Sequence, residues 1–538
     1  MSEFIQRGAV LQNQFTSDVA LVNLIQNIIP SKHLPEVTDE LTKLGERVIT
    51  DVLAMAKSAE AHPPELVNFD SWGNRIDEVI VNRGWTDLHK VSAEEKIVST
   101  GYARKYGAHS RIVQFAKLYL FHPSSAFYSC PLAMTDGAAK LIETYAPKQL
   151  SAAFDHLTSS EPSKFWTSGQ WMTERSGGSD VSHTETIARK MNGEWRLFGT
   201  KWFTSAITSE MSMALARIEG EKGNVVEGSR GLSLFYIEIR NGEGKLNNIE
   251  VLRLKDKLGT KALPTAELKL NGTRAELVGN IGDGVKQISS MFNVTRLYNS
   301  VTSVAAFRRI LALASDYSSK RMAFGKLIAE HTLNAQVLKE ASAQFNGCFH
   351  FTFLIAEIFG QEEVFTDQNN LSLDKEELNK ILRMLTPVLK LYTAKKTVLW
   401  TSELLEVFGG VGYIEDSGIP VMYRDNQVFS IWEGTTNVLS LDLLRALKKD
   451  QSWSVLVKFL KQEMAKMKDS HLKVTIEKAL ENLNQDIIGV SQKGDAAMEA
   501  EARHLAFKIG DLMSAFSWLR SNSDDTELLE YFTFKKFR

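Results

Sequence analysis

The fold class is decided by residues 184–204, which read Thr-Glu-Thr-Ile-Ala-Arg-Lys-Met-Asn-Gly-Glu-Trp-Arg-Leu-Phe-Gly-Thr-Lys-Trp-Phe-Thr. Two runs in this stretch, Thr184–Lys190 and Trp195–Thr204, flank the pair Asn192-Gly193. An Asn-Gly pair between strand-like runs is a strong signal of a two-residue β-hairpin. The stretch therefore predicts two antiparallel strands.

Two further segments nearby alternate with the period of two that is typical of strands. One is Gly231–Arg240, and the other is Thr265–Leu270, which is expected to end at Asn271-Gly272. Several short strands separated by turn signals predict a small barrel or sandwich over residues 165–285.

Apolar residues recur at helical spacing on both sides of this β region. Residues 1 to about 160 read as helical, for example over Asp39–Met55 and Ser110–Phe121, and the pattern is interrupted at Pro63-Pro64. Helical periodicity returns from Val285 onward, as in a bundle of long antiparallel helices. We expect a mainly α fold with a central β domain, divided into a helical N-terminal domain (1–164), the β domain (165–285), a four-helix bundle (286–450) and an additional helical C-terminal domain (451–538).

The bulk composition is that of an ordinary globular protein, with 538 residues, 43% hydrophobic and 24% charged residues, and a formal net charge of −2. Such a charge provides no global basic field for nucleic acid or an anionic membrane. The two cysteines, Cys130 and Cys348, lie among aromatic residues, so buried free thiols are expected and no metal site is. No apolar run is long enough for a membrane span, and Met1–Val10 shows no targeting segment.

A candidate general base lies in Ser430–Asn437, which reads Ser-Ile-Trp-Glu-Gly-Thr-Thr-Asn. Glu433 follows a large aromatic residue, and partial desolvation there would raise the pKa of its carboxyl and make it a better proton acceptor. Gly434 would allow the backbone to approach a ligand closely. Taken alone, the octamer fits a helix cap equally well.

Two other motifs have the composition of a binding site for a flat, polar ligand. Met172–Val181 combines hydroxyls, glycines and acids in a loop just ahead of the first predicted strand, which fits either anion binding or a solvated turn. In Gly199–Ser205, strand alternation would send Trp202 and Phe203 to opposite faces, one into the core and the other onto a ligand. Ordinary strand packing is the alternative.

The last two motifs lie in the predicted bundle. Arg321–Lys326 (Arg-Met-Ala-Phe-Gly-Lys) suits phosphate binding, because a guanidinium bonds phosphate through two donors, but a solvated basic loop fits as well. Glu406–Tyr413 (Glu-Val-Phe-Gly-Gly-Val-Gly-Tyr) is a glycine-rich break that would admit a close ligand or simply end a helix.

Taken in order, these five motifs resemble those of the acyl-CoA dehydrogenase family, and most closely its AidB-like branch. The resemblance covers about His62 to Leu447. It implies a helical N-terminal domain, a β-barrel or sandwich middle domain and a C-terminal four-helix bundle carrying the acyl-CoA site, with FAD bound where the domains meet. The additional C-terminal helical segment fits the branch too.

The resemblance also implies roles for individual residues. Glu433 matches the catalytic base. The residues that match cofactor contacts are Met172, Thr173, Gly178, Ser179, Phe203, Thr204, Ser205, Arg321, Phe324, Gly409, Gly410, Thr435 and Asn437. The residues that match substrate contacts are Ser179, Ser205, Asn293, Arg296 and Gly434. Arg321 and Phe324 would hold the FAD of a neighbouring subunit.

Some positions depart from the common family pattern. Arg175-Ser176-Gly177-Gly178 replaces Pro-Gly-Ala-Gly, Asn293 stands where an Asp contacts pantetheine, and Phe203 stands where many members have Trp. These changes leave FAD binding intact and concern acyl-chain preference and efficiency.

The implied reaction is FAD-dependent α,β-dehydrogenation of a medium- to long-chain fatty acyl-CoA to the trans-2-enoyl-CoA, in lipid metabolism. The implied partners are a homotetramer of the chain and electron-transfer flavoprotein as acceptor, in the cytoplasm or the mitochondrial matrix. The alternative is an AidB-type flavoprotein that binds acyl-CoA or associates with DNA with little turnover. Leu441–Arg538 carries 16 Lys and Arg against 15 Asp and Glu, interleaved, which disfavours DNA as a partner.

Overall fold

A computed structural model describes residues 7–220, 222–366, 371, 373–449, 451–521 and 526–537. The chain forms two compact units, each made from segments that are separated in sequence. Unit 1 comprises Met1–Ile49, Arg104–Pro123 and Arg296–Arg538, and unit 2 comprises Thr50–Ala103 and Ser124–Thr295. Helix α9 (Gly284–Ser318) contributes to both.

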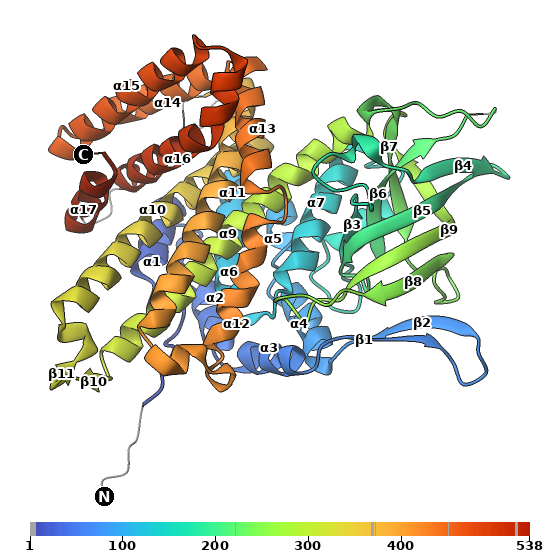
Figure 1. Ribbon diagram of the computed structural model, residues 1–538, viewed down its shortest axis with the longest axis horizontal. Coiled ribbons are helices and arrows are strands. Elements are labelled where there is room, and N and C mark those ends of the chain that lie inside the picture. Colours follow the sequence, from blue (N-terminus) through green and yellow to red (C-terminus); the bar gives the residue numbers. More distant parts are fainter. Residues whose placement is uncertain are drawn as a thin grey trace, which may run out of the picture. The chain divides into compact units, whose positions relative to one another are not determined.

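Unit 1 is built mainly from helices (Figure 1). They are α1 (Val19–Ile28), α2 (Leu34–Arg47), α6 (Ser110–Phe121), α9 from Arg296, α10 (Thr332–Glu363), α11 (Lys375–Glu406), α12 (Ile419–Asn426), α13 (Thr436–Lys449), α14 (Ser452–Lys466), α15 (His471–Ser491), α16 (Asp495–Arg520) and α17 (Thr526–Phe537). A small hairpin, β10 (Met322–Ala323) with β11 (Lys326–Leu327), separates α9 from α10.

The long helices of unit 1 pack through the apolar faces that the periodicity predicted. α10 packs against α11, and α16 packs against both. Phe345, Phe349 and Phe353 of α10 are buried, because they recur every four residues on one helix face. α11 begins with a capping box, in which Asp374 accepts from the backbone N–H of Glu377 at 2.8 Å.

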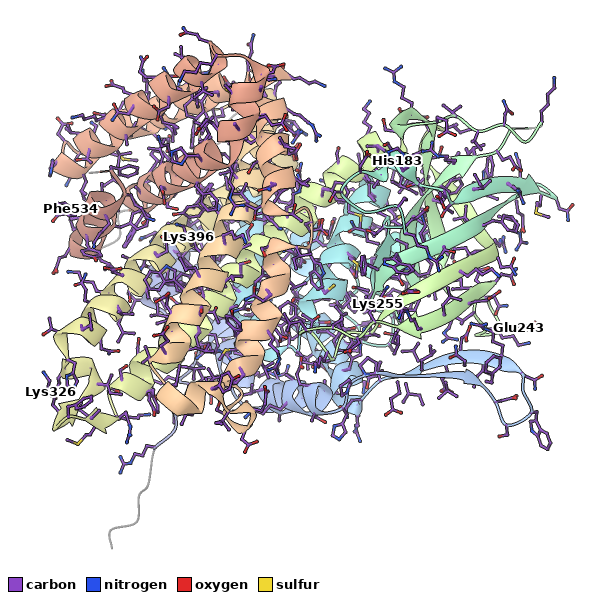
Figure 2. All side chains as sticks on the ribbon, viewed as in Figure 1. His183, Glu243, Lys255, Lys326, Lys396 and Phe534 are labelled. Carbon is purple, nitrogen blue, oxygen red and sulfur yellow. The ribbon has the colours of Figure 1, made fainter. Side chains whose placement is uncertain are left out.

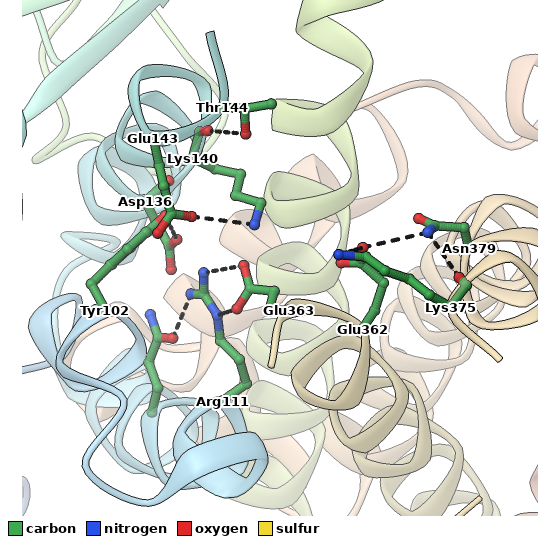
Figure 3. Close-up of polar contacts among 11 residues, drawn as sticks. Tyr102, Arg111, Asp136, Lys140, Glu143, Thr144, Glu362, Glu363, Lys375 and Asn379 are labelled. Atoms are coloured by element: carbon green, nitrogen blue, oxygen red, sulfur yellow. Dashed lines mark hydrogen bonds and ion pairs between the residues drawn. The ribbon is translucent and has the colours of Figure 1, made fainter. Parts of the chain in front are cut away.

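A buried ion pair joins the short helix α6 to α10. The Arg111 guanidinium donates to both carboxylate oxygens of Glu363, at 2.6 and 2.9 Å, and to the Gln114 amide oxygen at 2.7 Å (Figure 3). Every residue of α6 is buried, so this charge is compensated within the unit by a bidentate contact.

Unit 2 combines helices with a sheet that closes on itself. Its helices are α3 (Asp51–Ala61), α4 (Arg83–Glu94), α5 (Ser99–Ala103), α7 (Ser129–Tyr145) and α8 (Ser151–Leu157). Its strands are β1 (Glu65–Phe69), β2 (Arg75–Ile80), β3 (Ser168–Trp171), β4 (Ile187–Met191), β5 (Glu194–Ser205), β6 (Met211–Ile218), β7 (Leu232–Glu238), β8 (Ile249–Leu254) and β9 (Thr265–Val278).

The seven-stranded sheet of unit 2 has the order β3-β6-β4-β5-β9-β7, and β8 pairs with β9. Since β6 also pairs with β7, the strands β6, β4, β5, β9 and β7 form a closed ring. The expected small barrel or sandwich is therefore a barrel-like sheet. Its core is apolar and includes Trp171, Phe235 and Leu268, all fully buried.

Several local predictions are confirmed. Asn192 and Gly193 both have positive φ, 52° and 85°, as a type I′ hairpin turn requires, and they join β4 to β5. α6 has the predicted bounds. Cys130 and Cys348 are free and buried. A helical pattern is also predicted over Val455–Arg520, and this stretch forms α14, α15 and α16.

Four local predictions are wrong. The N-terminal region contains the hairpin β1–β2, and the expected helix over Asp39–Met55 is two helices, α2 and α3. The strand expected to end at Asn271-Gly272 continues to Val278, because Gly272, with φ 84°, forms a bulge opposite Leu197 and Phe198. The loop Met172–Val181 follows strand β3 and so does not precede the first strand.

The sequence also predicts a polar connection over residues 361–371 and an acidic segment over residues 524–527. Residues 367–370, Asp524 and Asp525 lie outside the described residues. Within the described part of the chain, no helix is long and apolar enough to cross a membrane.

Candidate active site

Glu433 lies in a tight turn of unit 1 between a 3-10 helix (Gln427–Ser430) and α13. The φ angles of Glu433 and Gly434 are 56° and 103°, so two successive residues have left-handed backbone. A Cβ at Gly434 would lie 2.9 Å from Leu439 Cδ2, so this position requires glycine. Because α13 begins at Thr436, Glu433 is outside the helix and is not its cap residue.

An arginine from α9 holds the backbone of this turn. Arg296 Nε donates to the Glu433 carbonyl at 3.2 Å, and Arg296 Nη1 lies 2.8 Å from Asp442 Oδ2. Arg383 Nη2 donates to the other oxygen of Asp442 at 2.7 Å. Burial alone would raise the pKa of Asp442, but the bonds from Arg383 and Arg296 outweigh it and lower that pKa below its ordinary value.

A buried lysine, Lys390 of α11, holds the next residue of the turn. Its Nζ donates to the Gly434 carbonyl at 2.7 Å, and the side chain is 0% exposed. Burial lowers the pKa of Lys390 to about 7, although the nearby Glu433 carboxylate opposes that shift. No sequence motif pointed to this residue, because it lies within the apolar periodicity of α11.

The remaining predicted residues of this region are exposed. Thr435 precedes α13 and Asn437 lies in its first turn, where Asn437 Oδ1 accepts from Arg503 of α16 at 3.0 Å. Gly409 and Gly410 open a 3-10 helix (Gly409–Tyr413), and a Cβ at either position would meet no atom within 4 Å.

The Arg321–Lys326 motif forms the β10–β11 hairpin, whose turn residues Phe324 and Gly325 have φ 50° and 82° (Lys326 is labelled in Figure 2). Phe324 is 98% exposed, while Arg321 is half-buried. An exposed aromatic side chain at the tip of a rigid hairpin is suited to contact with another molecule.

In unit 2, the loop after β3 is fixed by a buried ion pair. Glu174 Oε1 lies 2.6 Å from Lys201 Nζ, and Lys201 also donates to the Leu215 carbonyl at 2.9 Å. Burial would raise the pKa of Glu174, but Lys201 and hydrogen bonds from Thr186 and Glu185 lower it. The pair thereby joins the loop to β5 and β6.

The predicted residues of this loop differ in exposure. Met172 is buried, and the Thr173 carbonyl accepts from the Trp202 N–H at 3.0 Å. A Cβ at Gly178 would lie only 2.6 Å from Thr173 Oγ1, so the loop can close on itself only with glycine there. Ser179 is exposed at the loop surface.

The predicted alternation of Trp202 and Phe203 is wrong. The register between β5 and β9 shifts from Lys201–Leu268 to Thr204–Ala266, so the two aromatics occupy a bulge. Lys255 Nζ consequently lies 3.6 Å from the Trp202 ring centroid and 4.9 Å from that of Phe203 (Lys255 is labelled in Figure 2). Phe203 is 57% exposed, which leaves part of its ring open.

The hydroxyls that follow the aromatics have separate partners. Thr204 is buried and donates to the Ala266 carbonyl at 2.7 Å, so its hydroxyl is used within the sheet. Ser205 Oγ lies 3.1 Å from Thr265 Oγ1 and is half-buried. Asn293, one turn before Arg296 on α9, is also half-buried.

Family models match almost the whole length that carries these motifs. An adaptive response protein AidB N-terminal domain matches residues 8–161, an acyl-CoA dehydrogenase middle domain matches 169–273, and an acyl-CoA dehydrogenase C-terminal domain matches 282–448. The fold and these matches define a flavoprotein oxidoreductase.

Acyl-CoA dehydrogenase family member 11 of Caenorhabditis elegans is 41% identical, over 97% of this chain and 86% of that protein. The chain therefore belongs to the acyl-CoA dehydrogenase family, in its AidB-like branch.

Two solved structures are similar over nearly the full length. Caenorhabditis elegans ACDH-11 in complex with C11-CoA has a TM-score of 0.94 and 39% identity, covering 100% of this chain and 93% of that one. The apo form of Bd2924 has a TM-score of 0.89 and 48% identity, covering 97% and 100%.

FAD is the cofactor of this family. An acyl-CoA dehydrogenase from Bacillus anthracis complexed with FAD shares the fold, with a TM-score of 0.74 and 18% identity over 98% of this chain and 90% of that one. The residues of unit 2 fit such a group, because Phe203 offers an open aromatic face and Gly178 is exposed. In unit 1, Gly409 and Gly410 are exposed and carry no side chain that would block a ligand. Among the described residues, no set of three or more His, Cys, Asp or Glu side chains could hold a metal ion.

Proposed function

We propose that this protein catalyses α,β-dehydrogenation of a medium- to long-chain fatty acyl-CoA to the trans-2-enoyl-CoA, with Glu433 as the base. The observation that carries the proposal is the turn at Glu433 and Gly434, whose two carbonyls are each held by a cationic side chain. The C11-CoA in the complex of the Caenorhabditis elegans relative supports an acyl-CoA of that size range.

In the proposed reaction, Glu433 removes the α-proton of the substrate. The backbone N–H of the same residue donates to the thioester oxygen and stabilises the charge that develops there. Bound FAD supplies the acceptor for the hydride of the β-carbon. The positions of Glu433 and Gly434 are fixed before the substrate arrives, because Arg296 and Lys390 hold their carbonyls.

The remaining site assignments are part of the proposal. The residues proposed to contact FAD are Met172, Thr173, Gly178, Ser179, Phe203, Thr204, Ser205, Arg321, Phe324, Gly409, Gly410, Thr435 and Asn437. The residues proposed to contact the acyl-CoA are Ser179, Ser205, Asn293, Arg296 and Gly434.

We also propose the wider context. The division into domains at 1–164, 165–285, 286–450 and 451–538 is supported by the ranges of the three family matches. A homotetramer with electron-transfer flavoprotein as acceptor is proposed by analogy with the family. Two buried free thiols support a reducing compartment, the cytoplasm or the mitochondrial matrix.

The deciding experiment is an anaerobic titration of the FAD-loaded protein with saturated acyl-CoAs of graded chain length. Bleaching of the flavin absorbance, with enoyl-CoA detected as product, is expected and is greatest for medium to long chains. Tight binding of every chain length without bleaching would instead identify a protein that sequesters acyl-CoA.

Replacing Gly178 by Ala is expected to reduce the FAD content of the purified protein. The added Cβ would lie 2.6 Å from Thr173 Oγ1, and a threonine cannot move away as a flexible side chain can. The ratio of flavin to protein absorbance measures the effect. Gly242→Ala, in the same unit, is the control, because its Cβ would contact nothing within 4 Å and its backbone does not have a positive φ. Full FAD content in Gly178→Ala would exclude this loop from the cofactor site.

Replacing Phe324 by Ala is expected to lower FAD retention while leaving the folded chain intact. The side chain is 98% exposed, so its removal costs the chain little burial. FAD retention after gel filtration and the molar mass from sedimentation are measured together. Leu333→Ala, at a side chain 80% exposed, is the control. Unchanged FAD retention would remove Phe324 from the cofactor site.

A further inference from the structure

Lys390 is a charged side chain in an otherwise apolar part of α11, where Leu385, Val388 and Leu391 are buried. Its ammonium group is itself fully buried and donates to the Gly434 carbonyl at 2.7 Å. Burying an ammonium group is costly unless polar or charged partners compensate it. Lys390 bonds the backbone next to the candidate base although burying its charge costs free energy, which suggests that the side chain has a function in the site.

Two cationic side chains each bond one backbone carbonyl of the turn. Arg296 bonds the carbonyl of Glu433, and Lys390 bonds that of Gly434. They differ in their charge compensation, because Arg296 lies 2.8 Å from an oxygen of Asp442, which Arg383 also contacts. Among the charges that act on Lys390, the Glu433 carboxylate favours its protonated form, whereas Arg296 and Lys395 disfavour it.

We infer that Lys390 is a positioning residue for Glu433: it holds the Glu433–Gly434 turn in its left-handed conformation and, when protonated, favours the ionised carboxylate of the base. This inference rests on the proposed function, since it assumes that Glu433 removes the α-proton. Lys390 touches neither substrate nor cofactor in this role. It acts through the Gly434 carbonyl and through its charge.

The charge should be titratable in the neutral range, which gives the inference a signature. The pKa of Lys390 is lowered to about 7, chiefly by burial, so the cation is present below that pH and is lost as pH rises through it. The pKa of Asp442 is lowered, so this carboxylate stays ionised over the same range. Lys390 is thus a group beside Glu433 whose charge changes near pH 7.

The test compares kcat and KM against pH for the wild-type protein, Lys390→Met and Lys390→Gln, all loaded with FAD. Met removes the donor and the charge, whereas Gln keeps a donor without charge. In Lys390→Met, kcat is expected to fall about tenfold below pH 7, and its acid limb to move up by about one pH unit. The gap to wild type should narrow above pH 7, where wild-type Lys390 is neutral too.

A readout separate from activity excludes a merely structural role. Replacing a buried charge by an apolar side chain of similar size is often neutral or stabilising, so the midpoint of thermal unfolding of Lys390→Met should not fall. Lys380→Met, at a half-exposed position of the same helix, is the matched control and should keep the wild-type pH profile. If Lys390→Met does not fold, Lys390→Gln carries the same pH test.

The outcomes separate this inference from the proposed function. In a Glu433→Gln background, Lys390→Met is expected to cause no further loss of turnover. Wild-type pH profiles in both Lys390 variants, with Glu433→Gln inactive, would overturn the inference and leave the proposed function standing. Turnover retained by Glu433→Gln would overturn both.

Discussion

Replacing Glu433 by Gln is expected to lower kcat for acyl-CoA dehydrogenation by about 10²–10⁴-fold, the usual contribution of a general base. The neutral amide keeps the size and backbone of the turn but cannot accept the α-proton. FAD content should stay at the wild-type level, because Arg296 and Lys390 hold the turn through the backbone carbonyls of Glu433 and Gly434. These two hydrogen bonds do not depend on the side-chain carboxylate. Stopped-flow reduction of the flavin by acyl-CoA measures the chemical step directly.

Glu403→Gln provides the matched control, since Glu403 is an exposed carboxylate on α11 of the same unit. Its kcat and KM should match those of the wild-type protein. Flavin reduction at the wild-type rate in Glu433→Gln would assign the base to another residue, whereas loss of both FAD and folding would show that the carboxylate has a structural role.

Replacing Lys201 by Met is expected to lower the free energy of unfolding by about 3–5 kcal/mol, because it leaves Glu174 charged and unpaired in the interior. Both members of this pair are buried, and Lys201 is 0% exposed. The double variant Lys201→Met with Glu174→Gln should recover part of this loss, since it no longer buries an unpaired charge. Urea unfolding of the three proteins measures the difference.

Lys269→Met is the control for this pair, because Lys269 is a half-exposed residue of β9 whose contact to Glu250 is 3.7 Å. A loss of unfolding free energy within about 1 kcal/mol is expected there.

The stability that the Glu174–Lys201 pair contributes in the wild-type protein should also depend on pH in the acid range. The pKa of Glu174 is lowered in the fold, so its contribution is present above the ordinary pKa of Glu and is lost as pH falls through the folded value. Equal stability of Lys201→Met and wild type would contradict the assignment.

The parts of the fold that were predictable are those whose signals are local. The Asn192-Gly193 turn and helix α6 follow from residues next to each other in sequence. The bulges at Gly272 and at Trp202-Phe203 were not predictable, because they depend on pairing with a strand that lies elsewhere in the chain. The hairpin β1–β2, which follows Pro63-Pro64, was likewise not predicted, because the residues on either side of it have helical periodicity.

The candidate site shows the same limit. Glu433, Arg296 and Gly434 were selected from motifs, and in the structure Arg296 of α9 bonds the turn that contains Glu433 and Gly434. Lys390 and Asp442 were missed, since each lies in a helix whose pattern reads as ordinary packing or a solvated face. A hydrogen bond from a side chain to a distant carbonyl, such as that from Lys390 to Gly434, leaves no trace in local composition.

The Arg111–Glu363 pair has a consequence for how the chain is made. Its partners are separated by 252 residues, and the helix α6 that carries Arg111 is buried throughout. At about 5–20 residues per second, Arg111 is added to the growing chain about 13–50 s before Glu363. During that interval the apolar side chains and Arg111 of α6 cannot yet contact α10 and Glu363. Newly made chains should therefore depend on chaperones until α10 is complete, and a fragment ending before α10 should aggregate.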